Sequence, residues 1–423
     1  MNKHRSPASA GRRTASWLLL CLVCVAPVAS AIEGNTPGLA QAVDAAWKRA
    51  AEARRAEGES ARADANRRIA RSFAADEPSF GISRTEGDWY GGSRAGTGTE
   101  TEVGLSVPLW MPGQRGAARA AAGADVEWAE ANLAQARLEV AGRVREAAWA
   151  IAARQATQEQ VRAKVGFLAK LATDVGRRVK AGDLARSDEL SARADLLAAE
   201  AELADAEREL HDSVARWKVL TGLEVLPDAG EIENESHADV DSLLAKAGTP
   251  PSLVAAEKAV QRAEGELKAV RRSLGTPPEL TIGAKDEADS PGVVGERSLV
   301  MELRIPLGLG ARRSLVRAQA QTEFDVAQAE LSIARSRYAA ELEAARLAIA
   351  LADRQLDSES RRADLLAERV RLMEQAFAAG EIDLAELLLT TRYSAEADAD
   401  RARRHAEHGM AHARLLQAIG MLP

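Results

Sequence analysis

Three histidines near the C-terminal end of the sequence have a spacing that could bind a metal ion. His405, His408 and His412 are three and four residues apart, so on a helix their imidazoles fall within one arc. Neutral imidazole is a ligand for zinc, copper and nickel. His408 and His412 align with Leu210 and Val214, two packing positions that lie 198 residues earlier in an internal repeat. A packing and surface role is therefore favoured, with metal binding as the alternative.

Two acidic residues follow glycines at matching points of the sequence. Asp188 comes six residues after Gly182, and Glu386 comes six residues after Gly380. Glycine readily adopts the left-handed conformation that stops a helix, so both glycines are predicted to lie in turns between helices. The carboxylates either complement the dipole of the following helix or, around an opening, attract cations. Both interpretations stay open.

No catalytic constellation accompanies these residues. The sequence contains no G-x-S-x-G, no H-E-x-x-H and no phosphate-binding loop motif. Its 63 acidic residues outnumber its 56 basic ones, whereas binding of nucleic acid needs clustered positive charge. We therefore expect no enzymatic activity, no cofactor and no nucleic-acid partner.

The N-terminal residues have the pattern of a secretion signal. Basic residues precede an apolar run from Trp17 to Val28, and small residues follow, which predicts a signal peptide over residues 1–31. The exported chain would then begin near Ile32. Both cysteines, Cys21 and Cys24, would be removed with the signal, so the mature protein is expected to have neither a disulfide nor a lipid-bearing cysteine.

The remaining sequence consists of two copies of one unit. Residues 103–109 match residues 301–307 at an offset of 198, and Ala181-Gly-Asp-Leu184 matches Ala379-Gly-Glu-Ile382 at the same offset. Matches that keep one offset over this distance predict an internal structural repeat. We place the first repeat at residues 32–230 and the second at residues 231–423.

Each repeat combines a strand pair with long helices. Apolar residues alternate with polar ones on both sides of a turn-rich loop at about residues 79–107 and again at about 279–305, which predicts two strands in each repeat. An uninterrupted helical stretch from Pro112 to Val179 would be about 100 Å long. Shorter helical patterns at about residues 38–74 and 184–220 would flank it, the second with an apolar residue at every seventh position. The predicted fold class is mainly α, with four strands and long coiled-coil helices.

Four strands are too few to close a β-barrel within one chain. Single-chain bacterial barrels begin at about eight strands, and an open sheet edge in lipid leaves backbone groups unpaired. The strands must therefore be shared between subunits to cross a membrane. The alternative is a periplasmic coiled-coil scaffold or adaptor in which the strands form an ordinary β-domain.

The order of these elements resembles the TolC family of outer-membrane efflux proteins, the outer membrane factors, over essentially the whole mature chain. Residues 179–190 (VKAGDLARSDEL) and 377–388 (FAAGEIDLAELL) are similar to the family pattern of an aromatic or basic residue, a glycine and an acidic residue at the helical tip. Residues 107–119 (VPLWMPGQRGAAR) resemble the metal-efflux, CzcC-like branch.

The resemblance implies a homotrimer whose twelve strands form one transmembrane β-barrel in the outer membrane, with helices that extend through the periplasm. It implies three further partners, which are outer-membrane lipid, a periplasmic adaptor (membrane fusion) protein and an inner-membrane pump of the resistance-nodulation-division type. Gly182 and Gly380 would form the periplasmic tip turns. Asp188 and Glu386 would lie at the periplasmic aperture.

The sequence also departs from the family at the tip. The second acidic position of the family is Ser191 in one repeat and Leu389 in the other, which argues against a double acidic ring. The exported solute is not fixed by the sequence. The resemblance at residues 107–119 favours metal cations over organic compounds.

Overall fold

The computed structural model describes residues 38–88, 97–226, 240–273, 275–288, 295–307 and 310–423. The chain from Thr36 onward forms one compact unit. The predicted signal peptide and its cleavage point before Ile32 lie outside the described residues. Within the described ranges, no helix is both long and apolar enough to cross a membrane.

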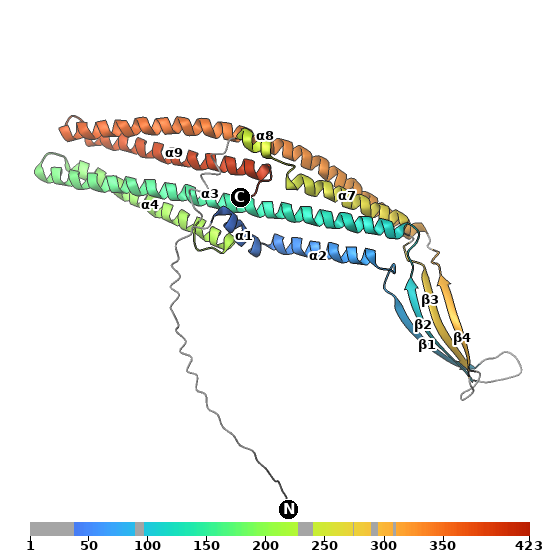
Figure 1. Cartoon of the computed structure of the whole chain (residues 1–423). Helices are drawn as coiled ribbons and strands as arrows, with labels where there is room; N and C mark the ends of the chain where they lie inside the picture. Colours follow the sequence, from blue (N-terminus) through green and yellow to red (C-terminus); the bar gives the residue numbers. More distant parts are fainter. Residues whose placement is uncertain (1–37, 89–96, 227–239, 274, 289–294, 308–309) are drawn as a thin grey trace, which may run out of the picture. The chain divides into compact units, whose positions relative to one another are not determined.

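Two very long helices form the frame of the fold. The helix α3 (Gln114–Ala181) has 68 residues and α8 (Gly310–Ala379) has 70, so each is about 100 Å long at 1.5 Å per residue. The helix α4 (Arg186–Thr221) turns back along α3, and α9 (Leu384–Ala418) turns back along α8 (Figure 1). The long helix and return helix predicted for the first repeat are therefore present.

Shorter helices cover the part of α3 and α8 that adjoins the strands. The helix α2 (Ala51–Arg71) packs on α3, and α7 (Pro251–Arg272) packs on both α3 and α8 (Figure 1). A seven-residue helix, α6 (Val240–Lys246), precedes α7. The helical layer thus runs from α2 through α3 and α7 to α8.

The single helical pattern expected at residues 38–74 is divided into two helices. Ala50 is extended, with φ −66° and ψ 136°, and it separates α1 (Leu39–Arg49) from α2. The physical reason is packing: α1 buries larger apolar residues such as Leu39 and Val43 against α3 and α4, whereas α2 buries only alanines against α3. No glycine or proline marks the break in the sequence.

Buried alanines line seams between the helices. In α4 the buried residues recur every seventh position at Ala192, Ala199 and Ala206, and α2 buries Ala56, Ala63 and Ala70 in the same way. The distance between packed helices depends on the side chains at the contact, so alanine permits close approach. The heptad of larger residues predicted for α4 is half-buried beside this seam, except for Trp217, which is fully buried.

The four strands form one antiparallel sheet in the order β1-β2-β3-β4. The strands are β1 (Ser79–Asp88), β2 (Thr97–Pro108), β3 (Glu279–Ala288) and β4 (Glu296–Arg304). They lie within the two predicted strand regions. The central pairing joins β2 to β3, with Leu105 opposite Ile282, so the two hairpins share one sheet.

Candidate functional site

One face of the sheet is apolar and uncovered in the single chain. Phe80, Leu105, Ile282 and Met301 are cross-strand neighbours that form one row across all four strands. Each is between 47% and 70% exposed. The next row on the same face is also apolar and contains Ile82, Val103, Ala284 and Leu299. An exposed apolar surface of this extent marks a site of contact with lipid or protein.

The opposite face of the sheet is polar. The hydroxyl groups of Ser106 and Thr281 are 2.6 Å apart across β2 and β3. Further along, Lys285 Nζ lies 2.9 Å from Glu100 Oε1 and 3.2 Å from Glu287 Oε2. The sheet therefore separates an apolar face from a hydrogen-bonded, charged one by simple alternation along each strand.

The outer edges of β1 and β4 have no partner strand among the described residues of this chain. An exposed strand edge presents unpaired N–H and C=O groups that can pair with another chain. In this sheet both edges border the apolar face. Both edges are therefore available for pairing with further strands.

At the far end of the helices, two glycines form the turns. Gly182 has φ +88° and ends α3, and Gly380 has φ +76° and ends α8. The Asp183 N–H donates to the Arg178 carbonyl oxygen at 2.9 Å, which satisfies one of the last carbonyl groups of α3. Both predicted turn glycines thus lie in the left-handed region that favours glycine.

A contact between Arg178 and Phe377 links the two turns. The guanidinium carbon of Arg178 lies 4.7 Å from the centroid of the Phe377 ring, and Arg178 Nη1 donates to the Phe377 carbonyl oxygen at 3.4 Å. Phe377 belongs to an apolar cluster that also contains Val175 from α3 and Leu384 and Leu387 from α9. These side chains connect the α3–α4 hairpin to the α8–α9 hairpin.

The two predicted aperture carboxylates lie in different environments. Asp188 accepts a hydrogen bond from the Ala185 N–H at 3.1 Å and lines a groove of about 490 Å³ between α3, α4 and α9, together with Lys164 and Arg392. Glu386 is exposed in the first turn of α9 and does not line that groove. The N-cap of α9 is Asp383, which accepts from the Glu386 N–H at 2.8 Å.

The three histidines of α9 lie in different environments. His405 is exposed. His408 Nε2 lies 2.7 Å from Asp353 Oδ1 on α8, and its ring centroid is 4.8 Å from that of buried His412. Across the part of the chain that the structure describes, no group of three or more His, Cys, Asp or Glu residues is arranged to hold a metal ion.

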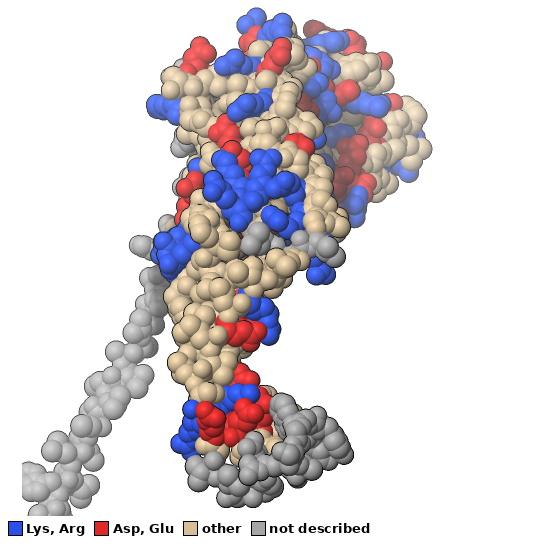
Figure 2. Space-filling model, turned by 90° about the vertical axis from the view of Figure 1, so that its right-hand side faces the viewer, with Lys and Arg blue, Asp and Glu red and all other residues tan. Residues whose placement is uncertain are grey.

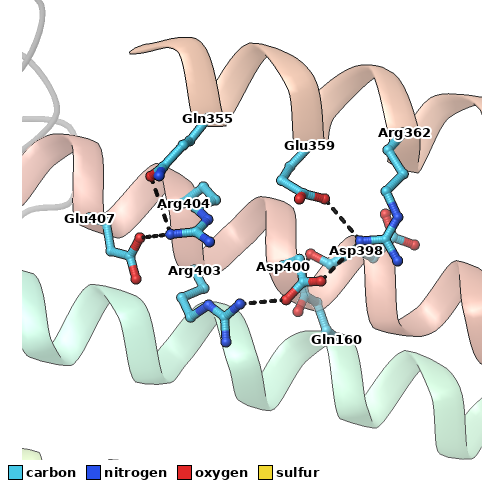
Figure 3. A network of polar contacts seen from close by, with 9 residues as sticks. All are labelled: Gln160, Gln355, Glu359, Arg362, Asp398, Asp400, Arg403, Arg404 and Glu407. Carbon is cyan, nitrogen blue, oxygen red and sulfur yellow. Dashed lines mark hydrogen bonds and ion pairs between the residues drawn. The ribbon is translucent and has the colours of Figure 1, made fainter. Parts of the chain in front are cut away.

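Hydrogen bonds and ion pairs of charged side chains connect α8 to α9 midway along their length. Arg362 from α8 contacts Glu359 on its own helix and Asp400 on α9, each at 3.1 Å (Figure 3). Arg404 from α9 reaches Gln355 on α8 at 3.2 Å. Gln160 adds a contact from α3, because its Nε2 donates to the Asp398 carbonyl oxygen (Figure 3). The network therefore connects α3, α8 and α9.

Residues 42–223 match the family described as outer membrane efflux protein. The chain is similar to this family over that segment. The match confirms the predicted resemblance to the TolC family of outer-membrane efflux proteins and the predicted outer-membrane location. The matched segment begins in α1 and ends just after α4, so it contains β1, β2 and the first of the two glycine turns.

Solved structures with similar folds include outer membrane proteins. The outer membrane protein VceC from Vibrio cholerae has a TM-score of 0.72 and 15% identity, over 90% of this chain and 96% of VceC. CusC has a TM-score of 0.73 and 14% identity, over 90% of this chain and 92% of CusC. The Campylobacter jejuni CmeC outer membrane channel has a TM-score of 0.71 and 14% identity, over 90% of this chain and 85% of CmeC. At these identities the likeness is one of fold. No curated protein sequence matches the chain.

Proposed function

We propose that three copies of this chain assemble into an efflux channel of the outer membrane. Their twelve strands close one transmembrane β-barrel, and their helices form a tube that extends through the periplasm. An inner-membrane pump of the resistance-nodulation-division type delivers solutes through a periplasmic adaptor at the helical turns. The channel conducts these solutes outward and catalyses no reaction.

The amphipathic four-stranded sheet is the observation that carries this proposal. Transmembrane barrels alternate apolar residues facing lipid with polar residues facing the interior, and the rows through Phe80 and Ile82 have this alternation. Four strands with two unpaired edges cannot remain open in lipid. Pairing β4 of one subunit with β1 of the next removes both edges at once.

The helical hairpins support the proposed two repeats of residues 32–230 and 231–423. The ends of α3 and α8 differ by 198 residue numbers, and so do the starts of α4 and α9. The left-handed glycines Gly182 and Gly380 keep the same offset, as do Gly222 and Gly420. Three subunits with two such hairpins each would surround the tube with six quasi-equivalent turns.

The proposed cargo includes metal cations. The support is the resemblance of residues 107–119 to the metal-efflux branch, together with the acidic residues beside the helical turns. Asp188 and Glu386 would concentrate cations at the entrance when three subunits bring several copies together. Organic solutes remain the alternative cargo.

A periplasmic scaffold without a barrel is the rival function, and extraction from membranes separates the two. The channel should resist high-salt and carbonate washes, require detergent for release, and migrate on a gel as a trimer until it is heated. Release of the full-length protein by the salt wash would establish the scaffold instead.

Two neighbouring substitutions on β4 sharpen this test. Leu299 is 76% exposed on the apolar face, and Ser298 is the next residue, on the polar face opposite Lys285. A charged residue on the lipid side of a barrel costs up to about 2–4 kcal/mol, less for Glu than for Lys or Arg. Leu299→Glu should therefore reduce trimer yield in the outer membrane, whereas Ser298→Glu should leave it unchanged. Equal yields for both variants would contradict a lipid-facing row.

A further inference from the structure

The helix ends that adjoin the sheet carry basic residues and no acidic ones. Residues 65–75, 103–124, 267–278 and 303–322 contain no Asp or Glu, although acidic residues outnumber basic ones in the chain. Basic side chains gather on the surface where the strands meet the helices (Figure 2). We define six arginines of these stretches as the arginine collar: Arg71, Arg115, Arg272, Arg312, Arg313 and Arg317.

Direct contacts hold the four helix ends together at this level. Arg115 Nη2 donates to the Arg71 carbonyl oxygen at 2.9 Å, which joins the start of α3 to the end of α2. The Leu109 N–H donates to the Pro278 carbonyl oxygen at 2.6 Å, which joins the segment before α3 to the segment after α7. The helices α7 and α8 pack against each other. The collar arginines therefore lie on helix ends that are joined to one another at the base of the sheet.

Helix stability does not account for this charge. Arg115, Arg312 and Arg313 lie in the first turns of α3 and α8, where the positive end of the helix dipole disfavours cations. Acidic residues are absent from both first turns. Within the described part of the chain, no collar arginine forms an ion pair with a carboxylate, whereas many arginines further along the helices do. The collar is thus a surplus of positive charge.

Exposed apolar side chains border the collar on the side of the sheet. Phe73 is 73% exposed and lies two residues beyond Arg71, and Leu307 is 93% exposed between β4 and α8. Ile305 beside it is 56% exposed. An apolar surface that gives way to basic groups matches the boundary at which acyl chains give way to lipid headgroups.

We propose that the arginine collar binds the phosphate groups of anionic phospholipids in the periplasmic leaflet of the outer membrane. Guanidinium groups bind phosphate oxygens through two parallel hydrogen bonds, and the exposed apolar neighbours accommodate the acyl chains. This inference rests on the proposed insertion of β1–β4 into that membrane. Beyond that insertion, the inference names anionic phospholipids as the bound class of lipid and the collar arginines as the residues that select them.

Spin-labelled lipids test the collar in the intact protein. The full chain is reconstituted in phosphatidylcholine bilayers with trace spin-labelled phosphatidylglycerol or phosphatidylcholine, and the motionally restricted fraction of each label is measured. Wild-type protein should restrict phosphatidylglycerol preferentially. A basic residue near an anionic surface contributes about fivefold, equivalent to about 1 kcal/mol. The Arg312→Gln, Arg313→Gln, Arg317→Gln triple variant should therefore lower the preference by at least about fivefold.

A second triple variant controls for net charge. Arg346→Gln, Arg369→Gln and Arg371→Gln remove the same charge from exposed positions of the same helix, away from the sheet. The preference for phosphatidylglycerol should be retained in this variant. Inorganic phosphate should weaken the preference no more than sodium chloride of equal ionic strength does. Equal loss in both triple variants, or specific competition by phosphate, would overturn headgroup binding by the collar.

Failure of the collar and failure of the channel give different results. Without a lipid-facing barrel, neither label would be restricted, which would refute the proposed function. With a barrel but no collar site, both labels would be restricted equally in wild-type protein.

Two further results would also overturn the lipid proposal. One is unchanged lipid preference with altered ion selectivity in the collar variant, which would place the arginines in the lumen. The other is a collar variant whose lipid preference is unchanged but which no longer sediments with purified cell-wall sacculi. That result would show that the arginines bind the cell wall instead of lipid.

Discussion

The guanidinium group of Arg178 lies over the ring of Phe377, 4.7 Å from its centroid. The contact joins α3 to α8 close to the glycines that end these helices. Arg178 Nε also lies 3.0 Å from Asp174 Oδ2, which fixes the direction of the guanidinium group. The relative position of the two helical hairpins near their turns therefore depends on a small number of side chains.

Arg178→Gln should loosen the helical turns while leaving the rest of the fold intact. A partly exposed cation–π contact contributes about 0.5–1 kcal/mol, so opening of the turn region should become a few-fold more frequent. Amide hydrogen exchange at residues 175–190 and 375–390 measures this change. Arg177→Gln is the matched control, because Arg177 is exposed and contacts only Asp174 on its own helix. Equal exchange in the two variants would show that the ring contact contributes nothing.

Gly182→Ala should destabilise the first turn by about 1 kcal/mol, because a residue with Cβ is strained at φ +88° even where space is available. Gly176→Ala is the control. Gly176 lies inside α3, where a Cβ would meet open space. Alanine is the better helix former there by about 1 kcal/mol. The two variants should shift the unfolding midpoint in opposite directions. A stabilising effect at both positions would contradict the requirement for a left-handed glycine.

The periodic features of the fold could be predicted from the sequence because they repeat. The strand regions, the long helix and the glycine turns depend on local alternation, heptads and backbone conformation, which the residues carry directly. Gly182 and Gly380 could be located because each ends an uninterrupted helical pattern. The alanine seams have a periodic signal as well, since Ala192, Ala199 and Ala206 recur every seventh residue, but the larger apolar residues of α4 recur with the same period and give the stronger hydrophobic pattern.

Contacts between non-equivalent positions could not be predicted in this way. Arg178 aligns with Ala376 in the second repeat, and Phe377 aligns with Val179 in the first, so the repeat gives no indication that they meet. The break at Ala50 likewise has no local marker, because it results from the packing of α1 against α3 and α4. The different environments of Asp188 and Glu386 also depend on tertiary packing.

The ion pair between Glu52 and Arg143 should make the folding stability of the protein depend on pH. Arg143 Nη1 donates to Glu52 Oε1 at 2.7 Å, and this hydrogen bond lowers the pKa of Glu52 from 4.5 to about 2. Because the folded pKa is the lower one, the stabilisation is fully present above about pH 4.5 and is lost as the pH falls through 2. The pair is partly exposed, so its contribution is about 1 kcal/mol or less.

Glu52→Gln tests this linkage because glutamine resembles the protonated carboxyl group. The variant should unfold at lower denaturant concentration than wild-type protein at pH 7. Near pH 2.5 the difference should be well below half of its value at pH 7. Tryptophan fluorescence during guanidinium unfolding measures both midpoints. A difference of the same size at both pH values would show that the carboxylate charge is not what stabilises this contact.

The carboxylates near the helical turns should affect conduction unequally. Glu386 is exposed and has no cationic partner within the described residues, whereas Asp188 is half-buried and accepts a hydrogen bond from the Ala185 N–H. Because the backbone hydrogen bond and partial burial hold the Asp188 carboxylate against the start of α4, Glu386→Gln should reduce cation preference in reconstituted channels more than Asp188→Asn does. Asparagine can still accept the hydrogen bond from Ala185, which keeps that variant folded. Both effects should fade as the Debye length falls from about 30 Å at 0.01 M salt to about 3 Å at 1 M. Unchanged conductance and selectivity at low salt in both variants would show that these acids only complement their helices.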